Sequence, residues 1–384
     1  MKRTRHQTGY LYLKGNLWML RYYDTQVLSD GSIRNVQKAH KLIEAEGDYR
    51  SRKAARLLAD EFLAPLNDGR TTPQGTMTLA QFVDNHYLPF VEAHKRISTF
   101  HGYRNLWNCY LKALAAIAMR DFKTVDGERI LLEIARKNGL TCTTLAHIKA
   151  FLSGVFRYAK RQGVLNTENP MRDVVLPKAK PRGDTYAYSL EEITQMLNVL
   201  EEPAATIVAA AAFTGARKGE LRGFLWENYD GTQIAISRSF WRSHVQPPKT
   251  KQSTAPVPVI AGLAARLDRH RALSGNPVNG LIFTGPKGNP VNLDAIVVSI
   301  IRPALKNVGL SWHGWHAFRR GLATTLHRLR VPDKTIQAIL RHSNVAVTQA
   351  CYIKTVSDDV AAAMLSLEYA PNMHLEHVPK PRVM

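Results

Sequence analysis

The chain has 384 residues, of which 45% are hydrophobic and 22% charged, so it is long enough for two or three domains that each bury a core. Lys and Arg outnumber Asp and Glu by 52 to 31, and the formal net charge of +21 indicates a polyanionic partner, most simply nucleic acid. Cys109, Cys142 and Cys351 are too widely spaced for a disulfide framework or a metal-ligand pattern. No apolar run reaches membrane-spanning length and the first residues are basic, so we expect a soluble, cytoplasmic protein.

The first 75 residues predict a small basic sheet followed by a helix. The predicted strands are residues 9–14, 17–23 and 33–41. Gly15 and Asn16 supply a turn between the first two strands. A helix is expected over residues 50–67, with Leu57 among the apolar residues at helical spacing. The first 41 residues hold eight Lys or Arg and two acidic residues, a local net charge of +6.

A linker rich in turn residues, 67–75, precedes a helical region. Helices are expected from residue 79, with Thr78 as N-cap, and over residues 98–114, 125–137 and 144–162. Five basic side chains on these helices are either phosphate contacts or ordinary solvated positions: Lys95, Arg96, Arg157, Lys160 and Arg161.

A second linker, residues 176–183, is basic and carries Lys178 and Lys180. Lysines in such a linker suit the backbone of a duplex that is gripped from two sides. Ser189 and Glu192 then form a capping-box signature, which predicts the start of the next helix.

Residues 207–213 are apolar and rich in alanine, as in a buried helix, and Thr214-Gly215 ends that pattern. Arg217 follows at the turn into another helix. Glu220 lies one helical turn further on, where it could brace Arg217.

Residues 232–241 alternate as a strand, and residues 254–260 are expected to be its return partner. The connection between them, residues 247–252, carries Lys249 and Lys251. A β-hairpin that presents a lysine is therefore expected here.

His316 and Arg319 are three residues apart, so they share one face of a helix that continues to about residue 329. A second helix with Ile336 and Leu340 at helical spacing places His342 just beyond its C-terminus. Tyr352 follows ten residues later.

In their order and spacing, two arginines, two histidines and one tyrosine resemble the motifs of the tyrosine recombinases, the phage-integrase family. The resemblance implies a catalytic set of Arg217, Lys249, His316, Arg319 and His342, with Tyr352 as the nucleophile. It implies DNA cleavage through a 3′-phosphotyrosyl intermediate, strand exchange through a four-way junction, and no metal or nucleotide cofactor. Arg341 and Arg320 depart from the family, which commonly has glycine and histidine there; Arg341 could add a phosphate contact or crowd the site.

The residue types fit that chemistry. Two guanidinium forks can each hold a phosphodiester by paired hydrogen bonds, and losing one such donor typically costs about 2.7–4 kcal/mol of transition-state stabilisation. A tyrosine hydroxyl, with a reference pKa of about 10, needs cationic or basic neighbours to attack. The 5′-oxygen leaving group needs a proton, for which Lys249 is our first choice and Lys251 the second.

The expected fold is multidomain α+β: a small β-sheet plus helix, a four-helix domain, and a mainly α catalytic domain with a β-hairpin. The expected boundaries are 1–75 for an arm-type DNA-binding-like domain, 76–178 for a helical core-binding domain, 179–370 for the catalytic domain and 371–384 for a tail. The expected DNA contacts are Lys95, Arg96, Arg157, Lys160, Arg161, Lys178, Lys180 and Lys251.

The resemblance also implies partners: double-stranded DNA, a homotetramer assembled on DNA, and accessory DNA-bending or directionality proteins. It places the protein at the nucleoid. The leading hypothesis is an integrase of a prophage or other mobile element. The alternatives are an Xer-type resolvase, a type IB topoisomerase, or a DNA-binding regulator of the same fold that has lost catalysis. For the first 75 residues, a β-hairpin appendage that contacts protein is the alternative.

Overall fold

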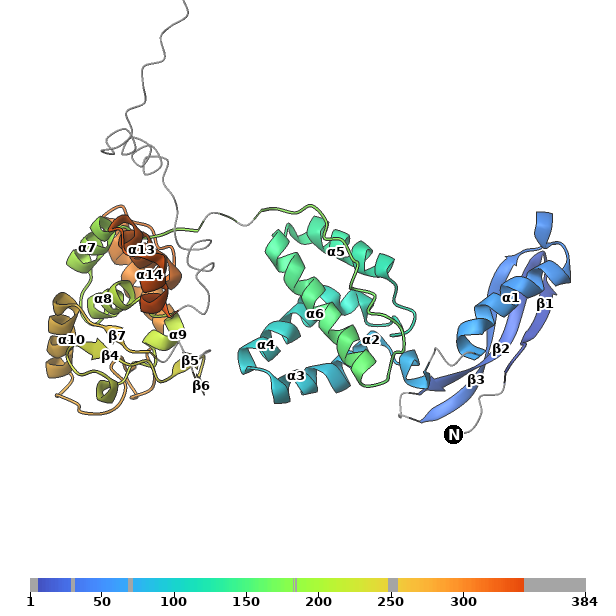
Figure 1. Ribbon diagram of the computed structural model, residues 1–384, viewed down its shortest axis with the longest axis horizontal. Helices are drawn as coiled ribbons and strands as arrows, with labels where there is room; N and C mark the ends of the chain where they lie inside the picture. Colours follow the sequence, from blue (N-terminus) through green and yellow to red (C-terminus); the bar gives the residue numbers. More distant parts are fainter. Residues whose placement is uncertain are drawn as a thin grey trace, which may run out of the picture. The chain divides into compact units, whose positions relative to one another are not determined.

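The computed structural model describes residues 6–28, 32–67, 72–181, 183, 185–247 and 255–341. The chain divides into two compact units, residues 1–183 and 184–384, whose described residues run from blue to green and from green to red in Figure 1. None of the described helices combines the length and apolar character that a membrane span needs. The predicted boundary at residue 75 lies inside the first unit, so the division into three domains stays a prediction.

A three-stranded antiparallel sheet opens the first unit, in the order β1-β2-β3. Its strands are β1 (Tyr10–Lys14), β2 (Leu17–Val27) and β3 (Ile33–Glu44), and the short helix η1 (Gly47–Tyr49) leads into α1 (Arg52–Asn67). Gly15 adopts a positive φ of 61° in the turn between β1 and β2, as the sequence indicates. Strands β2 and β3 are longer than predicted, because they pair over almost their full length, whereas β1 matches its prediction to within one residue.

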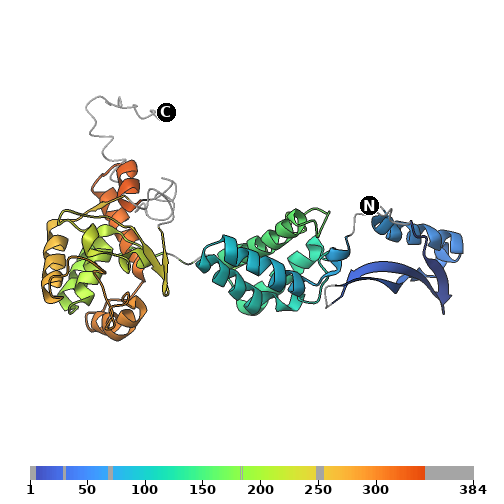
Figure 2. The same cartoon turned by 90° about the horizontal axis from the view of Figure 1, so that it is seen from below.

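Helix α1 covers one face of this sheet (Figures 1 and 2). Ala55, Ala59 and Leu63 are its fully buried residues, and they pack with Leu11 and Leu20 of the sheet. Leu57, which the spacing included in the apolar set, is 71% exposed. The prediction chose the larger apolar side chains, whereas small alanines face the sheet and let the helix approach it closely.

The rest of the first unit is helical. Its elements are η2 (Pro73–Thr76), α2 (Leu79–Phe82), η3 (Val83–Tyr87), α3 (Leu88–His94), α4 (Ile97–Leu106), η4 (Trp107–Leu111), η5 (Lys112–Leu114), α5 (Thr124–Asn138) and α6 (Cys142–Arg161). Thr78 caps α2 as predicted, and its hydroxyl accepts a hydrogen bond from the backbone N–H of Gln81. Trp107 and Phe151 are buried in a core of their own, separate from that of the sheet.

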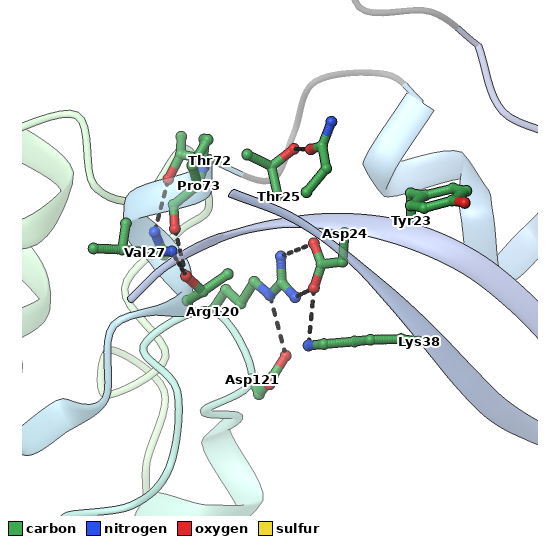
Figure 3. Close-up of polar contacts among 12 residues, drawn as sticks. Tyr23, Asp24, Thr25, Val27, Lys38, Thr72, Pro73, Arg120 and Asp121 are labelled. Atoms are coloured by element: carbon green, nitrogen blue, oxygen red, sulfur yellow. Dashed lines mark hydrogen bonds and ion pairs between the residues drawn. The ribbon is translucent and has the colours of Figure 1, made fainter. Parts of the chain in front are cut away.

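A buried carboxylate joins the sheet to this helical part (Figure 3). Asp24 of β2 is 2% exposed and accepts hydrogen bonds from both terminal nitrogens of Arg120, one at 2.9 Å. Lys38 of β3 donates a further bond at 3.0 Å. Beside them, the N–H of Val27 donates to the hydroxyl of Thr76 at 2.9 Å. These contacts link the sheet to the helical part within the first unit.

The second unit is built around α8, a helix buried on all sides, as its apolar sequence predicts. The helices of this unit are α7 (Leu190–Val199), α8 (Ala204–Thr214), α9 (Lys218–Leu221), η6 (Trp226–Asn228), α10 (Ala261–Leu273), α11 (Leu293–Ile296), η8 (Val297–Ile301), α12 (Arg302–Asn307), α13 (Trp315–Arg328) and α14 (Asp333–Leu340). Ser189 and Glu192 form the predicted capping box of α7. Helices α7, α10 and α13 contact α8.

The predicted long hairpin is two short strand pairs. Strands β4 (Gln233–Ile234) and β7 (Val257–Pro258) pair, which confirms the expected return partner. Strand β5 (Ser239–Trp241) instead pairs with β6 (His244–Gln246) around a two-residue turn. Arg242 takes a positive φ of 53° in that turn, and the chain reverses before residue 247.

Candidate active site

Arg217 stands at the junction of two helices. Helix α8 ends at Thr214, Gly215 adopts the left-handed conformation with a φ of 60°, and Arg217 is the N-cap of α9. This is the turn position that the sequence predicts. The side chain of Arg217 is partly exposed, so it can reach a ligand from a fixed backbone.

Glu220 holds Arg217 in place, as its spacing predicts. Its Oε1 accepts from Nη1 of Arg217 at 2.7 Å, and its Oε2 accepts from the backbone N–H of Arg217 at 3.0 Å. Burial alone would raise the pKa of Glu220, but the guanidinium groups of Arg341 and Arg217 outweigh burial and lower that pKa. The buried carboxylate is therefore ionised and fixes the direction of Arg217.

Arg319 on α13 is fully buried and reaches the same turn. Its Nη1 donates to the carbonyl of Gly215 at 2.6 Å, and its Nη2 donates to the carbonyl of Leu340. One guanidinium thus ties the turn before Arg217 to the C-terminal end of α14. The proposed catalytic residue His342 follows that end in the sequence.

His316 lies one helical turn before Arg319 on α13 and is exposed, whereas Arg319 is buried. Desolvation by its neighbours, together with the positive charges of Arg319, Arg320 and Arg217, lowers the pKa of His316, while Glu220 opposes the shift. The structure therefore brings Arg217, His316 and Arg319 into one electrostatic environment.

The β5–β6 hairpin packs against α9, the helix whose N-cap is Arg217. A side chain at Gly219 would place its Cβ 2.7 Å from the carbonyl oxygen of Phe240 in β5, so only glycine allows this approach. Arg222 at the end of α9 donates to the carbonyl of Arg242 in the hairpin turn at 2.8 Å. The sequence analysis assigned no role to Gly219 or Arg222, although a glycine two residues after the predicted catalytic Arg217 is a usable signal of close approach.

Four of the predicted site residues lie outside the described residues: Lys249, Lys251, His342 and Tyr352. Their roles stay predictions. Arg341, by contrast, is described, and its side chain is buried beside Glu220. In the described part of the chain no group of His, Cys, Asp and Glu side chains could hold a metal ion.

The predicted DNA contacts of the first unit fall into three sets. Arg157 and Lys160 of α6 line a cavity of about 450 Å³ together with Lys149 and Arg172, so they form a cluster. Arg161 instead lies over the rings of Phe90 and Tyr158. Lys95, Lys178 and Lys180 are exposed and Arg96 is half-buried at the start of α4.

Comparisons with known proteins agree with this geometry. The family model described as "Phage integrase family" matches residues 187–357. A XerC-like tyrosine recombinase of Caldanaerobacter subterraneus is 25% identical over 85% of this chain and 92% of its own. An integrase/recombinase-class protein of Sinorhizobium fredii is 30% identical over 42% of this chain and 81% of its own.

Solved structures share the fold. The Tn1549 transposon integrase in complex with transposon right end DNA is 19% identical, with a TM-score of 0.61 over 76% of this chain and 100% of its own. A lambda integrase tetramer bound to a Holliday junction is 17% identical, with a TM-score of 0.56 over 91% of this chain and 96% of its own. The order of the motif residues, the converging arginines and these relatives agree: the chain belongs to the phage-integrase family of tyrosine recombinases, enzymes of site-specific DNA recombination.

Proposed function

We propose that this recombinase is the integrase of a prophage or other mobile element and that Tyr352 is its nucleophile. The observation that carries the site assignment is the convergence of Arg217 and Arg319 from separate segments on one turn, with His316 beside them. Arg217 is partly exposed and held by a buried carboxylate, so it is a preorganised donor for a phosphodiester, whose charge grows on its non-bridging oxygens as bonds change. Arg319, which is fully buried, is proposed as the second donor.

In the proposed reaction, Tyr352 attacks the phosphorus and forms a 3′-phosphotyrosyl bond, while the bond to the 5′-oxygen breaks. Lys249 gives that oxygen its proton, with Lys251 as the second choice. His316 and His342 orient the phosphate and move protons. Because its pKa is lowered, His316 is mainly neutral at neutral pH, so it can both donate and accept a hydrogen bond.

The proposed partner is double-stranded DNA, held by a tetramer of this chain. The lambda integrase tetramer on a Holliday junction supports the assembly by analogy, and the net charge of +21 supports a polyanion. Arg157 and Lys160 are the strongest candidates for phosphate contacts on the first unit, because they line one cavity with Lys149, whereas Arg172 in the same cavity is paired with Glu168. We place the reaction at the nucleoid, with accessory DNA-bending or directionality proteins as further proposed partners.

The proposed arm-type DNA surface is the sheet face opposite α1. Arg21 lies 6.0 Å and 5.2 Å from the ring centres of Tyr10 and Tyr12, and Tyr23 is also exposed. Because side chains alternate along a strand, these residues share the face that α1 leaves uncovered. Basic and aromatic side chains on one uncovered face suit contact with a nucleic acid.

An Xer-type resolvase is the second candidate, since the XerC-like relative aligns over 85% of this chain. The Tn1549 neighbour favours a mobile element instead. A covalent-trapping assay separates the two: nicked duplexes carry either the element's own junction or a chromosomal dimer-resolution site. An adduct on the junction alone supports the integrase, and an adduct on the resolution site alone supports the resolvase.

A further inference from the structure

Arg341 has a backbone conformation that arginine seldom adopts. It follows α14 with φ of 55° and ψ of 45°, in the left-handed region that favours glycine. A left-handed arginine strains the backbone. Such strain often marks a functional position, so we expect the Arg341 side chain to make an interaction that matters for function.

The side chain of Arg341 is buried but only partly bonded. The residue is 2% exposed, and its Nη2 donates to Oε2 of Glu220 at 3.0 Å. Within the described residues, its Nε and Nη1 are buried and have no hydrogen-bond partner. A guanidinium stays protonated at ordinary pH. The N–H groups on Nε and Nη1 of Arg341 are therefore buried donors without an acceptor in the described part of the chain.

These unmet donors lie in the catalytic cluster. Glu220 is shared: its Oε2 accepts from Arg341 and from the backbone of Arg217, and its Oε1 accepts from Nη1 of Arg217. Arg319 donates to the carbonyl of Leu340, the residue directly before Arg341. Two guanidinium groups therefore share the carboxylate of Glu220, and a third, that of Arg319, is bonded to the carbonyl next to Arg341. Positive charge exceeds negative charge among these residues, which favours an added anion.

We infer that Arg341 is an additional phosphate-contacting residue of this site: Nη2 stays on Glu220, while Nε and Nη1 bind the oxygens of a phosphate. Identifying that phosphate with the DNA phosphodiester rests on the proposed function. The anion site itself does not.

The first test uses inorganic phosphate as the probe and calorimetric titration of the full chain at constant ionic strength. Arg341→Gly removes the guanidinium and suits the left-handed turn. Arg330→Gly is the matched control, because Arg330 also has a positive φ, of 58°, but is exposed. We expect Arg341→Gly to weaken phosphate binding at least about tenfold, as for a lost charge-assisted contact, and Arg330→Gly to leave it unchanged. Equal binding by wild type and Arg341→Gly would overturn the inference, even if the variant were less stable.

Arg341→Lys guards against a folding defect, since it keeps the charge but has no Nε–H and no planar fork. Weaker phosphate binding by this variant supports the inference, and wild-type binding opposes it. On a DNA substrate that wild type cleaves, Arg341→Gly should form the covalent adduct about 10²–10³-fold more slowly, as for a lost transition-state donor, with DNA affinity nearly unchanged. If wild type forms no adduct, the proposed function fails, while the phosphate titration still decides the role of Arg341.

Discussion

At the scale of single residues, one carboxylate organises the site. Glu220 is 4% exposed and is bonded to Arg217 through both of its oxygens. An arginine with a free side chain would have to be ordered by the substrate, at a cost in binding entropy. Glu220 orders it in advance, which is the condition for a donor to act on developing charge.

Replacing Glu220 tests that role. Glu220→Gln keeps the shape but removes the charge that faces Arg217 and Arg341, so we expect the free energy of unfolding to fall by roughly 1.5–3 kcal/mol. Adduct formation should slow more than DNA binding weakens, because Arg217 loses its fixed direction. Urea unfolding and a single-turnover adduct assay measure the two effects, with exposed Glu201→Gln as control. A variant that cleaves at the wild-type rate contradicts the bracing role.

At the scale of elements, the spacing of motif residues predicted much of what the structure describes. The pair Arg217 and Glu220 and the pair His316 and Arg319 were predictable because residues three apart share a helix face. The β5–β6 hairpin was not predictable, since its turn carries Arg242 rather than the glycine or asparagine that signals a tight turn. The burial of Arg341 has no local signal either, because it depends on Glu220, 121 positions away.

The seat of β5 on α9 gives an element-scale prediction. Gly219→Ala forces its Cβ against the carbonyl of Phe240, which cannot move as a side-chain tip would, so we expect a loss of about 1–3 kcal/mol of stability. Gly102→Ala in α4 meets no atom within 4 Å and should gain about 1 kcal/mol through helix propensity. Thermal unfolding of both variants compares their stabilities. A Gly219→Ala protein as stable as wild type would argue against close packing of β5 on α9.

At the scale of the whole molecule, the first unit depends on an ion pair between segments 96 positions apart, Asp24 and Arg120. Local sequence patterns do not predict a pair between residues so far apart, and the Asp24–Arg120 pair was not predicted from the sequence. Burial would raise the pKa of Asp24, but the hydrogen bonds and charges of Arg120 and Lys38 hold that pKa below its usual value. The sheet and the helical part are therefore coupled by a carboxylate that stays ionised.

This coupling predicts a pH dependence. The folded-state pKa of Asp24 is lowered. Its contribution to the free energy of unfolding is therefore fully present above the unfolded pKa of about 3.9, and it is lost as the pH falls through the folded-state pKa. At pH 7, Asp24→Asn should cost about 3–5 kcal/mol, as for a broken buried pair, and the difference from wild type should shrink in acid below about pH 4.

The matched control is Asp121→Asn, since Asp121 approaches the same arginine but its side chain is 67% exposed. It should cost no more than about 1 kcal/mol. Urea unfolding of the full chain, followed by hydrogen exchange of β2, observes the first unit separately from the second. If both substitutions lowered the free energy of unfolding equally, the burial of Asp24 would add nothing to the stability of the first unit.

The central claim is that Tyr352 forms a covalent bond with DNA, and peptide mass mapping of the trapped adduct tests it most directly. Wild type, Tyr352→Phe and the control variant Tyr369→Phe, which removes another tyrosine nearby in the sequence, are each incubated with a nicked duplex that carries the element's junction. We predict a 3′-phosphate on the peptide that contains Tyr352 in wild type and Tyr369→Phe, and no adduct in Tyr352→Phe although it binds the duplex. An adduct that persists in Tyr352→Phe, or a phosphate on another residue, would contradict the assignment.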